Sequence, residues 1–290
     1  MLLLENEPPT HAACCVSLEA AQAGPGSDTP TTGAQTIDPV VQAVVGATCG
    51  GLYRHLVGRL ETYPIPELPL PPGNGELFLE IGCNWGRWCV AAARSGYRVV
   101  GIDPSLEAIA AARRVAHQLG IEATYLVADA RHLPFPDGSF EVVFSYSVFQ
   151  HFAKIEALAS FDEIGRVLRP GGLAKVQMAN VYGMRSIWNQ LREHRFREPR
   201  HLFDIRYWSP GELRDELSPR VGRTALEVDG FFTLNPQPAD LELLPRRYRL
   251  VVRTSEALRR VSGRLPPLRY TADSVYAVSR RPRAGGYCTS

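Results

Sequence analysis

Short apolar runs alternate with stretches of helical character through the middle of the chain. Five of these runs predict buried strands, over residues 77–81, 98–102, 123–128, 140–145 and 173–178. Helices are expected between the strands, over residues 88–93, 105–119 and 154–168. Because strands alternate with helices, the pattern predicts an α/β fold with a doubly wound, parallel sheet.

The chain before the first strand has a different character. Residues 1–36 contain four acids and neither Lys nor Arg, so we expect a disordered leader. Residues 37–75 are expected to hold an N-terminal helix and then a Pro-rich linker. The helix is predicted over residues 38–63, where the pair Gly50-Gly51 weakens it.

The last third of the chain is less regular. Residues 181–218 mix aromatic residues with arginines, and residues 241–265 look helical and basic. Two further strands are expected, over residues 226–234 and 274–280.

The first two strands and the helix between them form a βαβ unit. Gly82 and Gly86 follow the first strand, and glycine there lets a ligand approach the backbone closely. Asp103 ends the second strand, 103 − 80 = 23 residues after Glu80. A carboxylate at this position can accept hydrogen bonds from both hydroxyls of a ribose. The unit therefore predicts a nucleoside-binding site.

The glycine pattern argues against a dinucleotide. A dinucleotide fingerprint needs glycine at the positions of Gly82, Asn84 and Arg87, and only the first is glycine. Arg87 would prevent the close helix–strand packing that the third glycine serves. Glu80 places an anion beside the turn, which suits a positively charged ligand better than a pyrophosphate.

Two motifs resemble those of the class I S-adenosylmethionine-dependent methyltransferases. The segment EIGCNWG, residues 80–86, looks like their first motif, with Asn84 in place of the middle glycine. Asn tolerates the left-handed backbone conformation better than most residues. The segment VVGIDPS, residues 99–105, looks like their second motif, and the similarity continues to about Asn180.

The resemblance implies the rest of the architecture. It predicts a Rossmann-like sheet of seven strands, mostly parallel with an antiparallel edge hairpin, within a methyltransferase domain over residues 76–290. It also predicts a helical cap, formed by insertions at residues 181–218 and 241–265.

The resemblance further implies S-adenosylmethionine as the cofactor. The residues expected to contact it are Glu80, Gly82, Asn84 and Gly86 at the methionine end, Asp103 and Pro104 at the ribose, and Asp129 and Ala130 at the adenine. Ser145 and Gln150 lie in the segment after the fourth strand, which lines the methyl-transfer site in this family. An Asp after a strand could equally cap a turn, so Asp129 has a structural alternative.

The function implied is transfer of a methyl group to a small-molecule acceptor, at oxygen. Methyl transfer needs alignment and a deprotonated nucleophile. His151 could be the base, since its unperturbed pKa lies near neutral, or it could be packed or hydrogen-bonded at a helix start. The alternative from another class is a non-catalytic scaffold or sensor that only binds the cofactor.

Nucleic acid is not expected as a partner. The chain reads Ser145-Tyr146-Ser147-Val148 where nucleobase amine methylases carry an Asn/Asp-Pro-Pro-aromatic motif. The net charge of +2 gives no argument for binding nucleic acid either. The six cysteines form no CxxC pair, so we expect free thiols, no metal site and a cytoplasmic location. The acceptor and the oligomeric state stay open.

A basic helix near the C-terminus leaves two possibilities. Seven arginines lie from Arg246 to Arg264, with Leu250, Val251, Leu258 and Val261 on an apolar side. Such a helix could make peripheral contact with an anionic membrane and serve a lipid-linked acceptor. It could equally pack against the domain with its arginines solvated.

Overall fold

The computed structural model describes residues 37–51, 53–192, 205–232 and 237–283, and the predicted leader lies outside them. The chain divides into two compact units, residues 1–63 and 64–290. The described part of the first unit contains helix α2 (Pro39–Gly51) and a short 3-10 helix, η1 (Arg54–Leu56). The prediction of one helix over residues 38–63 was therefore wrong beyond Gly51, because two adjacent glycines make a helix costly to continue.

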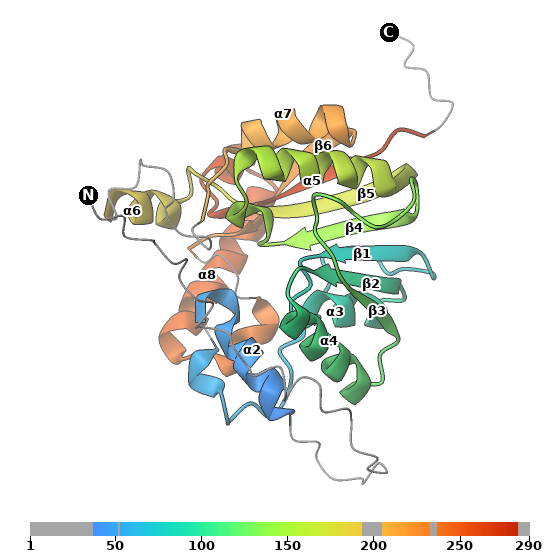
Figure 1. Ribbon diagram of the computed structural model, residues 1–290. Helices are drawn as coiled ribbons and strands as arrows, with labels where there is room; N and C mark the ends of the chain where they lie inside the picture. The colour runs from blue at the N-terminus through green and yellow to red at the C-terminus, as the bar shows by residue number, and fades with distance from the viewer. Residues whose placement is uncertain (1–36, 52, 193–204, 233–236, 284–290) are drawn as a thin grey trace, which may run out of the picture. The chain divides into compact units, whose positions relative to one another are not determined.

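In the described part of residues 64–290, a sheet of seven strands forms the centre (Figure 1). Its strands are β1 (Leu77–Ile81), β2 (Arg98–Asp103), β3 (Ala123–Val127), β4 (Phe140–Tyr146), β5 (Leu168–Ala179), β6 (Arg223–Gly230) and β7 (Ser274–Arg280). Their order is β3-β2-β1-β4-β5-β7-β6. The first five strands pair in parallel, and β7 is antiparallel to both β5 and β6. The predicted fold is confirmed.

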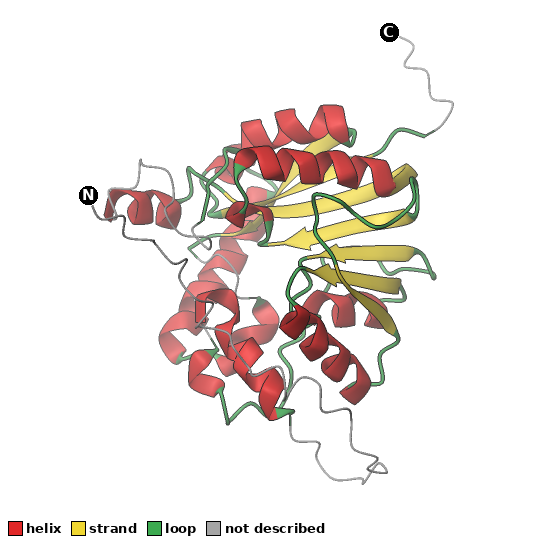
Figure 2. Ribbon diagram, in the orientation of Figure 1, coloured by secondary structure: helices red, strands yellow, loops and turns green. Residues whose placement is uncertain are grey.

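Helices cover both faces of this sheet (Figure 2). α3 (Arg87–Arg94) and α4 (Leu106–Gln118) pack on one face, against β2 and β3. α5 (Lys154–Val167) and α7 (Pro210–Arg220) lie side by side on the other face (Figure 1). Each face carries its own apolar core, so both layers are held by buried hydrophobic surface.

Local sequence signals place several element boundaries. The Ser105 hydroxyl accepts a hydrogen bond from the backbone N–H of Ala108 at 3.2 Å, which caps the start of α4. Gly120, with φ of +62°, follows its end. β5 begins at Leu168, directly after α5, whereas the sequence predicted a strand from 173. The register between β4 and β5 is irregular there, because two glycines follow Pro170.

The last third departs further from the prediction. β6 begins before the predicted strand at 226–234, and residues 233 and 234 lie outside the described part. The predicted helix over 241–265 is two elements, η3 (Pro238–Leu243) and α8 (Arg246–Ser262), because Pro245 ends one and opens the other. A further 3-10 helix, η4 (Pro266–Tyr270), precedes β7.

The predicted cap insertion at 181–218 also consists of separate elements. It contains α6 (Met184–Arg192), then residues 193–204, which lie outside the described part, and then most of α7. α7 buries Leu213 and Leu217 against the sheet, so this part of the insertion belongs to the layer beside α5. α6 and α8 lie at the end of the sheet to which the parallel strands point (Figure 2). Within the described residues, no helix has both the length and the apolar character that a membrane span requires.

Candidate active site

The turn after β1 has the backbone that the sequence predicted. Gly82, Asn84 and Gly86 all have positive φ, at +73°, +47° and +81°. A Cβ atom on Gly82 would lie 2.3 Å from Cγ2 of Val148, so only glycine fits between this turn and the segment after β4. Asn84 therefore adopts the left-handed conformation that the middle glycine of the motif would otherwise supply.

Asp103 joins this turn to the end of β2. Its Oδ2 accepts a hydrogen bond from the backbone N–H of Asn84 at 3.0 Å, and its Oδ1 accepts one from the N–H of Ser105 at 2.9 Å. Burial raises the pKa of Asp103, against the effect of these two bonds. Each carboxylate oxygen has a second lone pair, which can still accept from a ligand hydroxyl. Pro104, beside it, is exposed.

Glu80 is a buried acid at the end of β1. Its side chain is 2% exposed, and its Oε2 has no hydrogen-bond partner among the described residues. Burial raises the pKa of Glu80 to about 8, although hydrogen bonds with Cys89 lower it in part. A buried carboxyl with an unused oxygen is costly unless a donor or a cation meets it, so this position suits a ligand ammonium.

The end of β4 carries a strained residue that the sequence did not reveal. Ser147 has φ of +62°, which is rare for a residue with a side chain and often marks a functional site. Gln150 donates from Nε2 to the Ser147 hydroxyl at 2.8 Å, and its buried Oε1 has no partner among the described residues. Ser145 donates to the carbonyl oxygen of Ile81 at 3.2 Å, which ties β4 to β1.

His151 ends the short 3-10 helix η2 (Phe149–His151) and is half-buried. Its carbonyl oxygen accepts a hydrogen bond from Nη1 of Arg206 at 2.6 Å, and the backbone N–H of Arg206 donates to the carbonyl of Gln150 at 2.7 Å. The backbone of the segment after β4 is thus fixed by a residue from the region before α7. The role of His151 as a base stays a prediction.

Asp129 follows β3 and closes its own turn. Its Oδ1 accepts from the backbone N–H of Arg131 at 2.9 Å, and its Oδ2 lies 2.6 Å from Nη2 of the same arginine. This guanidinium lowers the pKa of Asp129. Asp129 therefore does cap its turn, which is the structural alternative that the sequence left open. An adenine amine would have to share the carboxylate with Arg131. Ala130 is buried beside it, and the adenine contacts stay a prediction.

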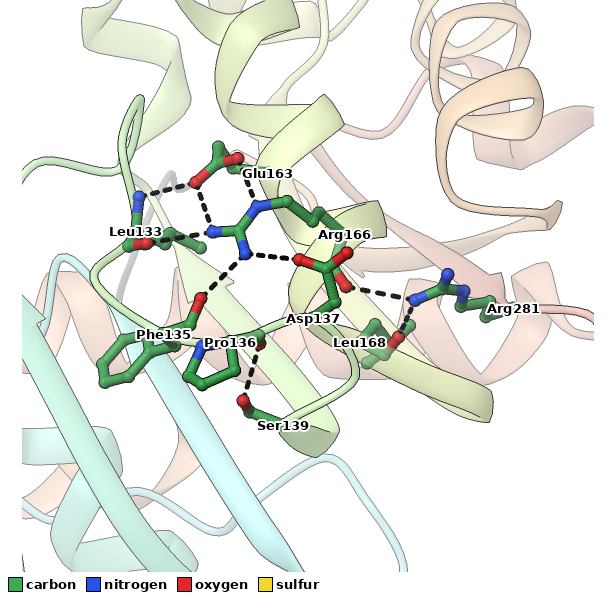
Figure 3. A network of polar contacts seen from close by, with 9 residues as sticks. All are labelled: Leu133, Phe135, Pro136, Asp137, Ser139, Glu163, Arg166, Leu168 and Arg281. Carbon is green, nitrogen blue, oxygen red and sulfur yellow. Dashed lines mark hydrogen bonds and ion pairs between the residues drawn. The ribbon is translucent and has the colours of Figure 1, made fainter.

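Arg166 holds the loop between β3 and β4 in place (Figure 3). From α5, its guanidinium donates to the carbonyl oxygens of Leu133 and Phe135 at 2.9 and 2.8 Å and pairs with Glu163. Glu163 in turn accepts from the backbone N–H of Leu133 at 2.7 Å, and Arg166 lowers its pKa. The loop that carries Asp129 is therefore fastened to α5 through its backbone.

A buried ion pair joins α3 to η3, and the sequence did not indicate it. Nη2 of Arg87 lies 2.8 and 2.9 Å from the two carboxylate oxygens of Asp240, and both side chains are buried. Asp240 also accepts from the backbone N–H of Gln237 at 2.8 Å. Arg87 is the first residue of the helix that follows the glycine turn. The turn is therefore anchored on a segment 153 residues later in the chain.

Comparisons with known proteins agree with this geometry. Residues 78–172 match the model of a family described as a methyltransferase domain. These residues form a methyltransferase domain. A segment of the chain is 39% identical over 113 residues to the demethylmenaquinone methyltransferase of Thermus thermophilus, and this match covers 39% of the chain and 46% of the relative. A second match, to a ubiquinone biosynthesis O-methyltransferase of Agrobacterium fabrum, is 33% identical over 102 residues and covers 35% of the chain and 40% of that relative.

The matches to these two relatives thus span less than half of each relative's length. The fold has a wider match, to the crystal structure of an S-adenosylmethionine-dependent methyltransferase from Methanosarcina mazei. The TM-score is 0.53 at 19% identity, over 73% of this chain and 95% of that structure. This likeness shows the fold. The family and the fold imply S-adenosylmethionine as the cofactor.

Proposed function

We propose that the protein transfers a methyl group from S-adenosylmethionine to a small-molecule acceptor, at oxygen. The observation that carries the proposal is the unpartnered Oε2 of buried Glu80 beside a glycine turn that is fastened to Asp103. The site lies where the strand order reverses between β1 and β4, which is where doubly wound sheets bind their ligands.

The residues present fit this cofactor part by part. Glu80 would meet the ammonium group, and the backbone of the glycine turn at Gly82 and Gly86 would hold the methionine end. Asp103 would accept from the ribose hydroxyls, and Asp129 and the Ala130 backbone would contact the adenine. When bound, the cofactor supplies a methyl group on a sulfonium ion.

The chain's own task is then to align the acceptor and to take its proton. His151 is the proposed base, and Ser145 and Gln150 would position the segment that carries it. Gln150 keeps a buried Oε1 available for the ligand. Methylation at oxygen is supported by the relative named as an O-methyltransferase.

Turnover tests the proposal against a scaffold or sensor. The protein is incubated with S-adenosylmethionine and a panel of phenols and quinols, and S-adenosylhomocysteine is measured by mass spectrometry. Product that accumulates only when an acceptor is present supports methyl transfer. Cofactor binding without turnover on any acceptor would favour the non-catalytic alternative.

An acceptor linked to a lipid is a second candidate. α8 exposes Leu250 by 68% and Val261 by 41%, and α6 exposes Trp188 by 64%. Exposed apolar side chains beside arginines suit the surface of an anionic membrane. Co-sedimentation with anionic liposomes should then weaken with salt and on replacing Arg246 and Arg253 with Gln. If the protein does not bind the liposomes at low salt, an acceptor that is not linked to a lipid is favoured.

A further inference from the structure

A polar cluster lies across the strands on the far side of β4 from the cofactor turn. We call its members, Tyr146, Gln177, Asp229, Gln237 and Ser274, the Asp229 cluster. Oδ2 of Asp229 accepts three hydrogen bonds, from Ser274 Oγ at 2.6 Å, the Tyr146 hydroxyl at 3.1 Å and Gln177 Nε2 at 3.3 Å. The Tyr146 hydroxyl accepts from Gln237 Nε2 at 2.7 Å. The network thus brings together residues from four strands and from the start of η3.

The cluster has a buried floor and a more open rim. Gln177 and Ser274 are fully buried, whereas Tyr146, Asp229 and Gln237 are half-buried. Oε1 of Gln177 is buried and has no hydrogen-bond partner among the described residues. An amide oxygen in this state costs free energy, which a donor on a bound ligand would offset. Together with the carboxylate of Asp229, it offers acceptors to a group that donates hydrogen bonds.

Strand register places the cluster next to the proposed cofactor site. Glu80 pairs with Phe144, and Tyr146 lies two residues further along β4, so its side chain is on the same face of the sheet. Tyr146 pairs in turn with Gln177 on β5. Strand spacing and residue rise place Gln177 roughly 12 Å from Glu80 at the level of the backbone. The cluster therefore lies on the same face of the sheet as Glu80, two strands away, with Tyr146 at the last position of β4.

Aromatic rings adjoin the cluster and favour a flat acceptor. The ring of Tyr146 lies 4.8 Å from that of Trp88 and 6.1 Å from that of Tyr276, centroid to centroid. Gln237, on the rim, also donates its backbone N–H to Asp240, the partner of Arg87. The cluster is therefore connected to the helix that begins at the cofactor turn.

From this geometry we infer that the Asp229 cluster is the acceptor subsite and that it binds a hydroxyl group of a small aromatic acceptor. One hydroxyl of the acceptor donates to Gln177 Oε1, and an adjacent hydroxyl, where the ring carries one as catechol does, donates to the Asp229 carboxylate. Tyr146 donates to that carboxylate and is itself held by Gln237. The inference rests on the proposed function and names the substrate class of the same site.

The test uses catechol as a minimal hydroxyl-bearing ring and 1,2-dimethoxybenzene as its counterpart without hydroxyl groups. Both are titrated by NMR into the full chain saturated with S-adenosylhomocysteine. We expect millimolar or tighter binding of catechol, and binding of 1,2-dimethoxybenzene at least about tenfold weaker. Asp229→Asn and Gln177→Leu should each weaken catechol binding by about tenfold.

Controls separate this inference from the proposed function. Asp215→Asn, an exposed acid on α7 on the other face of the sheet, should bind catechol as the wild type does. Calorimetry with S-adenosylhomocysteine shows whether each variant keeps a folded cofactor site. If Asp229→Asn does not bind S-adenosylhomocysteine, the catechol affinity of Gln177→Leu tests the subsite instead. If the wild type does not bind S-adenosylhomocysteine at all, the result contradicts the proposed function.

Three results would overturn the subsite while cofactor binding holds. They are no catechol binding at millimolar concentration, equal affinity for catechol and 1,2-dimethoxybenzene, and unchanged catechol affinity in folded Asp229→Asn or Gln177→Leu.

Discussion

Asp103 accepts a hydrogen bond from the backbone N–H of Asn84, a residue nineteen positions earlier in the chain. This bond connects the end of β2 to the glycine turn after β1, and it needs Asn84 in the left-handed conformation. The carboxylate therefore shapes the turn, and its remaining lone pairs are the ones that we propose for the ribose hydroxyls. Loss of Asp103 would disturb both parts of the proposed cofactor site.

Glu80 should release a proton when the cofactor binds. Its pKa of about 8 means that the carboxyl is protonated at a pH of about 6.5, and an ammonium ligand would ionise it. Calorimetry with S-adenosylmethionine at that pH, in two buffers of different ionisation enthalpy, should show release of about one proton. Glu80→Gln should bind more weakly and release none. Equal proton release by wild type and Glu80→Gln would place the ammonium elsewhere.

The effect of Glu80 on stability without ligand has the opposite sign to that of a salt-bridged acid. Because its folded pKa is raised, the folded chain holds the proton that the unfolded chain loses above a pH of about 4.3. This contribution is present below that pH and disappears as the pH rises through about 8. The stability of Glu80→Gln relative to that of the wild type should therefore rise as the pH rises towards about 8. Melting temperatures of the two proteins measured across this pH range test the expectation.

His151 is proposed as the base, and its loss should affect turnover alone. His151→Ala should lower the rate of methyl transfer by about 10² with the best acceptor of the panel, while affinity for the cofactor stays near that of the wild type. His117→Ala, an exposed residue near the end of α4, serves as a surface control. If cofactor affinity falls with turnover, His151 supports the fold and the base lies elsewhere.

The ion pair of Arg87 and Asp240 should be important for stability. Asp240→Ala leaves a buried guanidinium without its carboxylate, which costs about 3 to 5 kcal/mol in comparable pairs. Urea unfolding should show this loss, and Arg87→Met combined with Asp240→Leu should recover part of it, because no buried charge is left. A free energy of unfolding for Asp240→Ala equal to that of the wild type would refute a structural role.

The network around Arg166 predicts a dependence of stability on pH. Arg166 lowers the pKa of Glu163, so the pair stabilises the fold above the unfolded pKa of about 4.3 and is lost as the pH falls below it. Arg166→Met should destabilise the protein by about 1 to 2 kcal/mol at neutral pH, since its partly exposed side chain is screened. The difference in melting temperature from wild type should shrink at a pH of about 3. A difference that is independent of pH would contradict the role of Glu163.

Much of the fold and of the geometry of the proposed cofactor site follows from local sequence. The strands, the turn at Gly82 and the acid at Asp103 depend on apolar runs and on residues within one βαβ unit. The pairing of Arg87 with Asp240 does not, because it joins residues 153 positions apart. The same holds for the Asp229 cluster, whose members meet only when four strands and η3 come together. The strain at Ser147 was also invisible, because nothing about serine signals a positive φ.

The measurement that tests the account most directly is calorimetric titration of S-adenosylmethionine into the wild-type chain and into Asp103→Ala. The wild type should bind the cofactor, and Asp103→Ala should bind it at least about tenfold more weakly, because two charge-assisted hydrogen bonds to the ribose are lost. Asp215→Ala, on the opposite face of the sheet, should bind as the wild type does. Unchanged affinity in folded Asp103→Ala, or tight binding of NAD by the wild type, would contradict the account.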